Sequence, residues 1–160
     1  MSSKLFDALV VGAGPAGLAA ALALGRICRT AIVFDSGQFR NSNVTAMHTV
    51  PSRDGSNPVE FREITKSQIT AKYTTISFLE ASITKAERAE VDDGYEGFQL
   101  MDSQARLYSG RKLILATGTK DVLPDIPGYS DNWPSHMYVS VVWIQTGYSR
   151  TWSWLTSIQQ

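Results

Sequence analysis

The sequence predicts an α/β domain built on a parallel sheet, and three segments among its first 35 residues predict it. Leu5 to Val11 is a short apolar run, rich in strand-forming residues and bounded by glycine, which is typical of a buried parallel strand. The segment LAAALALGRI that follows a glycine loop favours a helix. Thr30 to Phe34 has the pattern of a second buried strand. Together the three segments form one strand–helix–strand unit.

Composition narrows the class of protein. The 160 residues are 43% hydrophobic and 19% charged, as expected of one soluble globular domain. Fifteen basic residues balance fifteen acidic ones, so we expect neither a nucleic-acid nor a membrane partner. The single cysteine, Cys28, excludes a disulfide framework, a thiolate metal cluster and an internal redox dithiol. We also expect no signal peptide and no membrane span, and therefore a cytoplasmic location.

The loop between the first strand and the helix has the sequence GAGPAG. Gly12 permits a tight turn off the strand, Gly14 lets the backbone approach a pyrophosphate, and Gly17 lets helix and strand pack closely. The N-terminus of the helix offers N–H groups and partial positive charge to a diphosphate. Pro15 is tolerated because a first-turn N–H has no partner within the helix. The pattern predicts a dinucleotide site, the alternative being a glycine turn in an ordinary α/β protein.

Asp35 lies 18 residues beyond Gly17, at the end of the second strand. A carboxylate at this place can accept hydrogen bonds from ribose hydroxyls. It also disfavours NADP on this loop, since it would repel a 2′-phosphate.

The middle of the chain predicts a helix and then strands. Asn57, Pro58 and Glu60 form a helix start, and the helix is expected to run to about Tyr73. Its apolar face should hold Phe61, Ile64, Gln68 and Ile69, while Arg62, Glu63 and Lys66 should form a solvated face rather than a site.

From Thr75 to Leu107 the pattern becomes that of strands. A third parallel strand comes first, and antiparallel strands joined by acidic and glycine turns follow. Asp92 and Asp93 could suggest a metal, but Asp-Asp-Gly between strands favours a turn. Arg111 to Gly118 is a further strand, ending on Ala-Thr-Gly.

The order of these motifs resembles the flavoproteins with two dinucleotide-binding domains. GAGPAG followed by VFDSGQFRN is similar to the thioredoxin reductase-like group, and more closely to the fungal flavoenzymes that oxidise dithiols in gliotoxin-type secondary-metabolite pathways. The resemblance runs from about Phe6 to Tyr138. Its further motifs are Met47-His48, Asn57 to Phe61, Ala116 to Asp121 and Asp125 to Tyr129.

The resemblance implies a Rossmann-like FAD-binding domain, with a parallel sheet, helices and a small antiparallel β-meander, incomplete relative to the family. It implies FAD along one series of residues: Gly12, Gly14, Pro15, Ala16 and Gly17 at the pyrophosphate, Asp35 at the adenosine ribose, Ser36, Gly37, Arg40, Asn41 and His48 toward the flavin, and Ala116 beside the cofactor. Each of three assignments has an alternative. His48 could be a loop histidine bonded to backbone, Arg40 a solvated cation, and the strand before Gly118 could simply end in a turn.

The chemistry of that family needs parts that the 160 residues do not contain. A Cys-x-x-Cys pair is expected near positions 139–143, where the sequence is VSVVW. A second glycine-rich unit for NADPH and a C-terminal return segment are also missing from these residues. Cys28 is expected to be a small buried residue, the alternative being an exposed, reactive thiol beside Arg26 and Arg29. We therefore expect weak or partial FAD binding, and no turnover by the dithiol route.

The composition changes at the end of the chain. Residues 139–160 hold three of the four tryptophans and one charge, Arg150. Val-Ser at their start is what a common intron donor sequence encodes, so we interpret residues 1–138 as the N-terminal portion of an FAD-binding domain and residues 139–160 as translated intron in a truncated product. The alternative is a genuine aromatic tail that docks on a partner.

Three functions remain open. The first is an FAD-dependent oxidoreductase that acts on a small-molecule thiol or disulfide, or on a thioredoxin-like partner, with oxygen or NADP(H) as the other reactant. The second is a non-catalytic FAD- or nucleotide-binding module, and the third is an NAD(P)-dependent Rossmann oxidoreductase. The resemblance suggests a homodimer but leaves the oligomeric state open.

Overall fold

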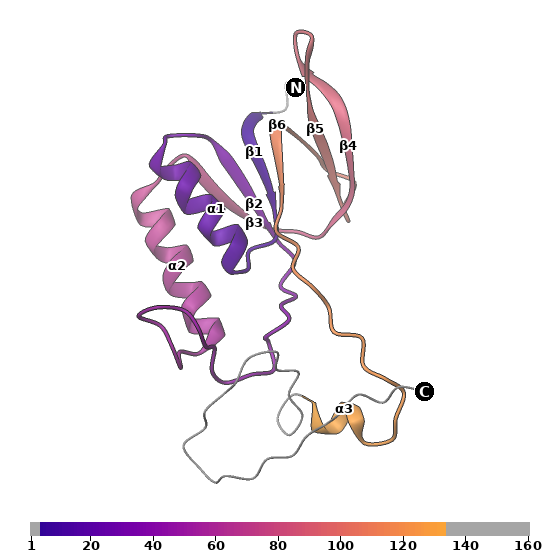
Figure 1. The fold of residues 1–160 in the computed structure, drawn as a ribbon. Coiled ribbons are helices and arrows are strands. Elements are labelled where there is room, and N and C mark those ends of the chain that lie inside the picture. Colours follow the sequence, from indigo (N-terminus) through magenta and orange to yellow (C-terminus); the bar gives the residue numbers. More distant parts are fainter. Residues whose placement is uncertain (1–3, 134–160) are drawn as a thin grey trace. The chain divides into compact units, whose positions relative to one another are not determined.

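The computed structural model describes residues 4–133 and contains one mixed sheet with two long helices (Figure 1). The sheet has six strands in the order β3-β2-β1-β6-β5-β4. The elements along the chain are β1 (Leu5–Val11), α1 (Pro15–Arg26), β2 (Ala31–Asp35), α2 (Pro58–Lys72), β3 (Ile76–Glu80), β4 (Ile83–Asp92), β5 (Tyr95–Asp102), β6 (Leu107–Leu115) and α3 (Tyr129–Asn132).

β1 lies at the centre of the parallel part of the sheet. It pairs in parallel with β2, with Val10 opposite Val33, and with β6, with Val10 opposite Ile114. β3 extends the parallel part beyond β2, whereas β4, β5 and β6 form an antiparallel meander. The predicted Rossmann-like fold, its third parallel strand and its antiparallel meander are therefore confirmed.

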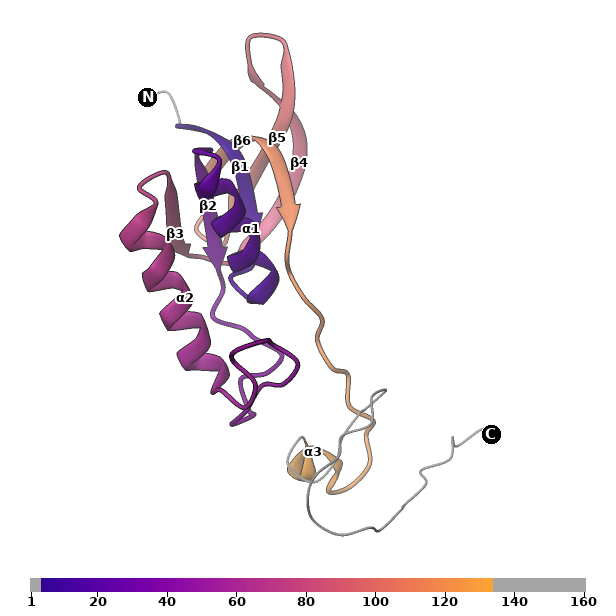
Figure 2. The same cartoon turned by 60° about the vertical axis from the view of Figure 1, so that its left-hand side comes forward.

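Alternate residues of β1 and β2 enter two separate cores, because successive side chains of a strand point to opposite faces. Ala8, Val10 and Val33 pack against residues of both α1 and α2, and both helices lie on the same side of the sheet (Figure 2). Leu9 and Phe34 face the other way and pack with Leu100 and other residues of the meander. This double burial explains why both strands are almost continuously apolar.

The second helix begins where the sequence indicates. The Asn57 side chain accepts hydrogen bonds from the backbone N–H groups of Val59 (2.8 Å) and Glu60 (3.4 Å), and Pro58 is the first helical residue. The expected apolar face is only partly correct. Phe61 and Ile69 pack into the core, but Ile64 is 39% exposed and Gln68 is exposed as well.

Cys28 does not occupy the buried position that we expected. It follows the C-terminal end of α1 with a φ of +56°, and its side chain is exposed. The Cys28 N–H donates to the carbonyl of Gly25 (3.1 Å), and the Arg29 N–H donates to that of Leu24 (3.0 Å). The helix thus ends in a left-handed turn, a place that glycine usually occupies, and the turn directs the thiol to solvent.

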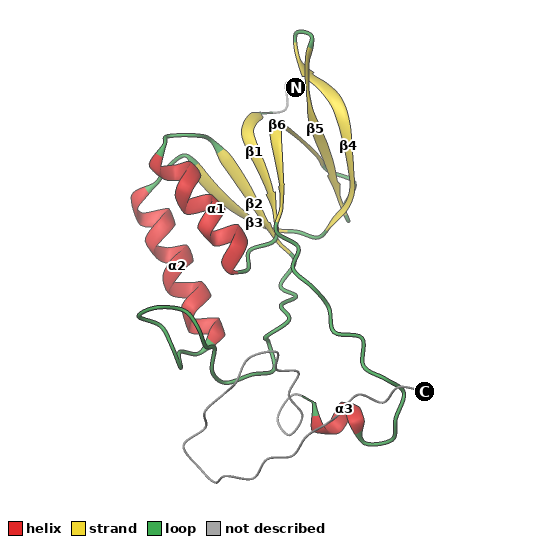
Figure 3. Cartoon of the chain, in the orientation of Figure 1, coloured by secondary structure: helices red, strands yellow, loops and turns green. Residues whose placement is uncertain are grey.

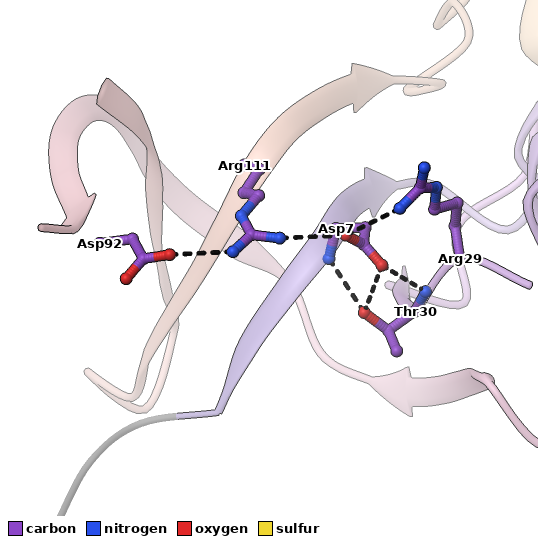
Figure 4. Close-up of polar contacts among 5 residues, drawn as sticks. All are labelled: Asp7, Arg29, Thr30, Asp92 and Arg111. Atoms are coloured by element: carbon purple, nitrogen blue, oxygen red, sulfur yellow. Dashed lines mark hydrogen bonds and ion pairs between the residues drawn. The ribbon is translucent and has the colours of Figure 1, made fainter. Parts of the chain in front are cut away.

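The carboxylate of Asp7 in β1 connects neighbouring segments of the sheet through hydrogen bonds and ion pairs (Figure 4). The Asp7 carboxylate accepts hydrogen bonds from the N–H and the hydroxyl of Thr30, both at 2.9 Å. Arg29 lies 3.9 Å and Arg111 3.5 Å from it, and Arg111 also binds Asp92 at 2.8 Å. The backbone hydrogen bond from Thr30 is the main cause that lowers the pKa of Asp7, against the opposing effect of burial. This network joins β1, β4, β6 and the segment directly before β2.

Asp102 is a buried carboxylate at the turn between β5 and β6, with 1% of its side chain exposed. Burial alone would raise its pKa, but hydrogen bonds outweigh this effect and lower the pKa to about 2. The donors are the N–H groups of Gln104 and Arg106 (both 2.9 Å), the Arg106 guanidinium (2.7 Å) and the Tyr108 hydroxyl (3.1 Å). The Tyr108 ring packs edge-on against the Phe34 ring, with 4.9 Å between the ring centres.

Asp102→Asn is expected to lower the melting temperature at pH 7 by about 5 °C or more, because four donors lose a charged acceptor. The pKa of Asp102 is lower in the folded chain than its ordinary 3.8. Its contribution is therefore complete above pH 4 and lost as the pH falls toward 2. Thermal melts from pH 2 to 7 should show the two proteins converging at the acid end, with the exposed Asp93→Asn variant as control. A constant difference across this range would contradict the prediction.

The chain divides into two units, Met1–Leu123 and Pro124–Gln160. In the second unit the structure describes the short helix α3, which follows Gly128 at a φ of +78°, and the stacked rings of Tyr129 and Trp133 (6.4 Å). The predictions for residues 139–160 lie outside the described residues. Among residues 4–133, none of the helices is long and apolar enough to cross a membrane.

Candidate functional site

A cleft of about 640 Å³ lies where β1, β2 and β6 reach their carboxyl ends. The loops that leave β2 and β6 start from this same edge of the sheet (Figure 3). Ligands of open α/β sheets bind at this edge, between strands whose connections diverge. The lining residues are Val11, Gly12, Ala13, Gly14, Pro15, Phe34, Asp35, Ser36, Gln38, Phe39, Arg40, Asn41, Ala81, Ser82, Ile83, Ala116, Thr117, Gly118 and Thr119.

Two glycines of the loop are required by packing within the chain. Gly12 has a φ of +107°, and a Cβ at this residue would overlap the carbonyl oxygen of Ala116. A Cβ at Gly17 would overlap the carbonyl oxygen of Gly12. These close approaches bring the first turn of α1 and the end of β6 against the end of β1. Gly17 therefore acts behind the cleft and is not among its lining residues.

Gly14 differs from both. It is the N-cap of α1 in extended conformation (φ −72°), and a Cβ there would meet nothing within 4 Å. No packing in the described chain therefore demands a glycine at this place. The open space lies in front of the first turn of α1, whose N–H groups lack partners within the helix. It fits the close approach of an anionic diphosphate to the backbone.

Asp35 closes the end of β2 and faces the cleft. Its Oδ1 accepts a hydrogen bond from the N–H of Gly37 (2.9 Å), which has a φ of +71°. This contact orients the carboxylate and leaves the second oxygen to accept from a ligand. Gly37 lines an adjoining cavity of about 330 Å³, together with Asp35, Ser36, Glu80, Ala81 and Ser82.

Arg40 is held by an ion pair that the sequence did not suggest. Its Nε lies 3.0 Å and 2.9 Å from the two carboxylate oxygens of Asp121. The hydrogen bond to Asp121, together with the charge of that carboxylate, raises the pKa of Arg40. The pair connects the loop after β2 to the loop after β6, 81 residues away, and both loops line the cleft.

Arg62 corrects the expectation of a solvated face on α2. Its guanidinium carbon lies 3.8 Å from the centre of the Phe39 ring, and its Nη1 donates to the side-chain oxygen of Asn41 at 3.1 Å. The side chain is half-buried rather than solvated, whereas Glu63 is exposed as expected.

His48 and Ala16 lie outside the cleft lining. The Nδ1 of His48 is 3.4 Å from the carboxylate of Asp54, and both side chains are more than half exposed. The structure thus brings together Gly12, Gly14, Pro15, Asp35, Ser36, Arg40, Asn41 and Ala116, places Gly37 beside them, and does not place Ala16, Gly17 or His48 at the cleft.

Several lining residues escaped the sequence analysis. Ala81 and Ser82 directly follow β3, so the carboxyl-end rule that selects Asp35 would also have selected them. Thr119 lies just after the Ala-Thr-Gly segment at the end of β6, whose backbone the resemblance had already placed near the cofactor. Phe39 has no such signal, because it lies in an irregular loop.

The acidic pair Asp92-Asp93 lies at the end of β4 and in the turn that follows it. Asp93 and Gly94 form the turn between β4 and β5, and Asp92 binds Arg111. Within residues 4–133 there is no group of three or more His, Cys, Asp or Glu side chains that could hold a metal ion.

Comparison with known proteins identifies the family. A model of the pyridine nucleotide-disulphide oxidoreductase family matches residues 6–142. The thioredoxin reductase tcpT of Claviceps purpurea is 47% identical over 133 residues, which are 82% of this chain and 40% of that protein. The thioredoxin reductase sirT of Leptosphaeria maculans is 44% identical over 136 residues, 84% of this chain and 40% of that protein. The chain spans about 40% of the length of these curated relatives.

A solved structure agrees with the fold. The crystal structure of an oxidoreductase from Agrobacterium tumefaciens is 32% identical, with a TM-score of 0.74 over 82% of this chain and 43% of that one. The family match begins at Phe6, where the sequence resemblance begins, and includes the glycine loop, Asp35 and the cleft. The chain belongs to the pyridine nucleotide-disulphide oxidoreductase family.

Proposed function

We propose that the chain is the FAD-binding part of a thioredoxin reductase-like oxidoreductase that acts on thiol and disulfide groups in fungal secondary metabolism, in the cytoplasm. The observation that carries the proposal is Gly14, whose missing side chain leaves open space in front of the first turn of α1. The similarity to fungal thioredoxin reductases supports the assignment to this group.

The chain's own residues would hold the cofactor along the cleft. The backbone N–H groups of Ala16 and Gly17 would donate to the diphosphate, although neither residue lines the cleft, because Pro15 has no N–H and the Leu18 N–H already donates to the Gly14 carbonyl. Asp35 would accept hydrogen bonds from the ribose hydroxyls. Arg40 and Asn41 lie along the same cleft, and Ala116 closes it beside Gly12. When bound, FAD would supply two-electron chemistry at its flavin ring.

The substrate chemistry needs a dithiol beyond Cys28. A cycle between a dithiol and its disulfide needs two cysteines, and the 160 residues contain one, in an exposed turn. We expect these residues to bind FAD without oxidising a dithiol through cysteines of their own. A small-molecule thiol or disulfide is the proposed substrate, a thioredoxin-like protein is the proposed alternative, and a homodimer is the proposed assembly.

The test is the visible absorption spectrum of the purified 160-residue chain, before and after incubation with excess FAD and desalting. Retained flavin bands near one FAD per chain would support the proposal. A colourless chain that binds NAD in a parallel titration would instead support the NAD-dependent alternative. A folded chain that binds neither FAD nor NAD in equilibrium titrations, without desalting, would overturn the proposed function.

We also keep the division at residue 138 as a proposal. A transcript spliced after the Tyr138 codon and continuing into a Cys-x-x-Cys would support the interpretation of residues 139–160 as translated intron. An uninterrupted transcript that encodes this tail would contradict it.

A further inference from the structure

The loop after β2 presents four consecutive residues to the cleft, Gln38, Phe39, Arg40 and Asn41. The loop runs to the start of α2 and has no strand ladder, so its position depends on turns and side-chain contacts. Arg40 is held by Asp121. Phe39 and Asn41 are both contacted by a single side chain, Arg62 of α2.

Arg62 contacts the loop in two ways at once. Its guanidinium lies over the Phe39 ring at 3.8 Å and donates to Asn41 at 3.1 Å. A planar guanidinium can stack on a ring while its N–H groups donate in the plane, which the ammonium group of lysine cannot do. Burial lowers the pKa of Arg62, while the charges of Asp35 and Glu63 raise it. The Arg62 guanidinium is a cation at neutral pH, and it interacts electrostatically with the carboxylate of Asp35.

We infer that Arg62 is a positioning residue for the dinucleotide, holding Phe39 and Asn41 in place along the cleft without lining it. The inference rests on the proposed function, since it names the side chain that shapes the proposed FAD site. Arg62 is not among the residues that line the cleft. Its effect on binding must therefore pass through the loop.

The first test compares FAD dissociation constants of the full 160-residue chain by flavin fluorescence titration. Arg62→Ala should weaken binding about ten-fold, because both the stacking and the charged hydrogen bond are lost. Arg62→Lys should weaken it about three-fold, because it keeps the charge but not the two contacts together. If Arg62 acted only through its positive charge near Asp35, Arg62→Lys would have the same FAD dissociation constant as the unchanged chain, and this result would contradict a positioning role.

Lys66 offers a matched control on the same helix. It lies one turn after Arg62, and its Nζ is 5.3 Å from the centre of the Phe78 ring, which is not part of the cleft lining. Lys66→Ala also removes a cation over an aromatic ring and should leave FAD affinity unchanged. Equal affinities of the unchanged chain and Arg62→Ala would overturn the inference.

The second test needs no cofactor. Amide hydrogen exchange of the segment 38–42 in the FAD-free chain should be about ten-fold faster in Arg62→Ala, with the β1 amides unchanged. Unchanged exchange of these amides in Arg62→Ala would overturn the inference, whether or not the chain binds FAD. Failure of the chain to bind FAD would count against the proposed function alone. Arg62→Met keeps the apolar stem and serves the same two measurements if Arg62→Ala fails to fold.

Discussion

Gly14→Val is expected to weaken FAD binding at least about 100-fold while leaving the chain folded. A Cβ at Gly14 would meet no described atom within 4 Å, and the extended backbone suits a β-branched residue, so we expect the variant to fold. The branched side chain would occupy the space in front of α1 where we propose the diphosphate. Charged hydrogen bonds from the first turn are each worth about 1.5–3 kcal/mol, so losing two of them explains the effect.

The measurement is an FAD titration together with a thermal melt of the FAD-free chain. Valine is a poorer N-cap than glycine, and we expect a loss of stability of about 1 kcal/mol or less. Gly14→Ala should have a smaller effect on FAD affinity, since one methyl group fills less of the space. Unchanged FAD affinity in Gly14→Val would show that the diphosphate does not approach the backbone here.

Gly17→Ala is expected to destabilise the fold rather than to weaken FAD binding directly. We expect its free energy of unfolding to fall by about 2–3 kcal/mol. Its Cβ would overlap the backbone oxygen of Gly12, which cannot rotate away, so α1 must shift relative to β1. Alanine is about 1 kcal/mol more favourable than glycine inside a helix, and this gain offsets only part of the strain. The melting temperature of the FAD-free chain should fall by about 5–10 °C.

Gly14→Ala is the matched control for this variant, because it adds the same methyl group to open space three residues earlier in the chain. In melts without FAD, Gly17→Ala should unfold at a lower temperature than Gly14→Ala, because Gly17 is required for packing and Gly14 for binding. A melting temperature of Gly17→Ala equal to that of Gly14→Ala would show that the close approach of α1 to β1 is not needed for the fold.

The local sequence was sufficient for the elements and for three residues of the cleft, Gly12, Gly14 and Asp35. A strand, a glycine loop, a helix and a second strand ending in Asp35 follow one another within 35 residues, and each is encoded by neighbouring residues. The N-cap at Asn57 is equally local, since its side chain bonds to N–H groups two and three residues later. Such signals need no knowledge of the rest of the fold, because propensity, capping and burial periodicity act over a few residues.

The tertiary structure alone decided which side chains meet across the chain. Arg62 appeared to be one of several charges on a helix surface until the loop after β2 brought Phe39 and Asn41 against it, 21 residues away from Asn41 in sequence. Arg40 meets Asp121 across 81 residues, and Cys28 is exposed because of the way its helix ends. Irregular loops carry no periodic pattern, so the contacts that hold them depend on where the sheet brings their ends together.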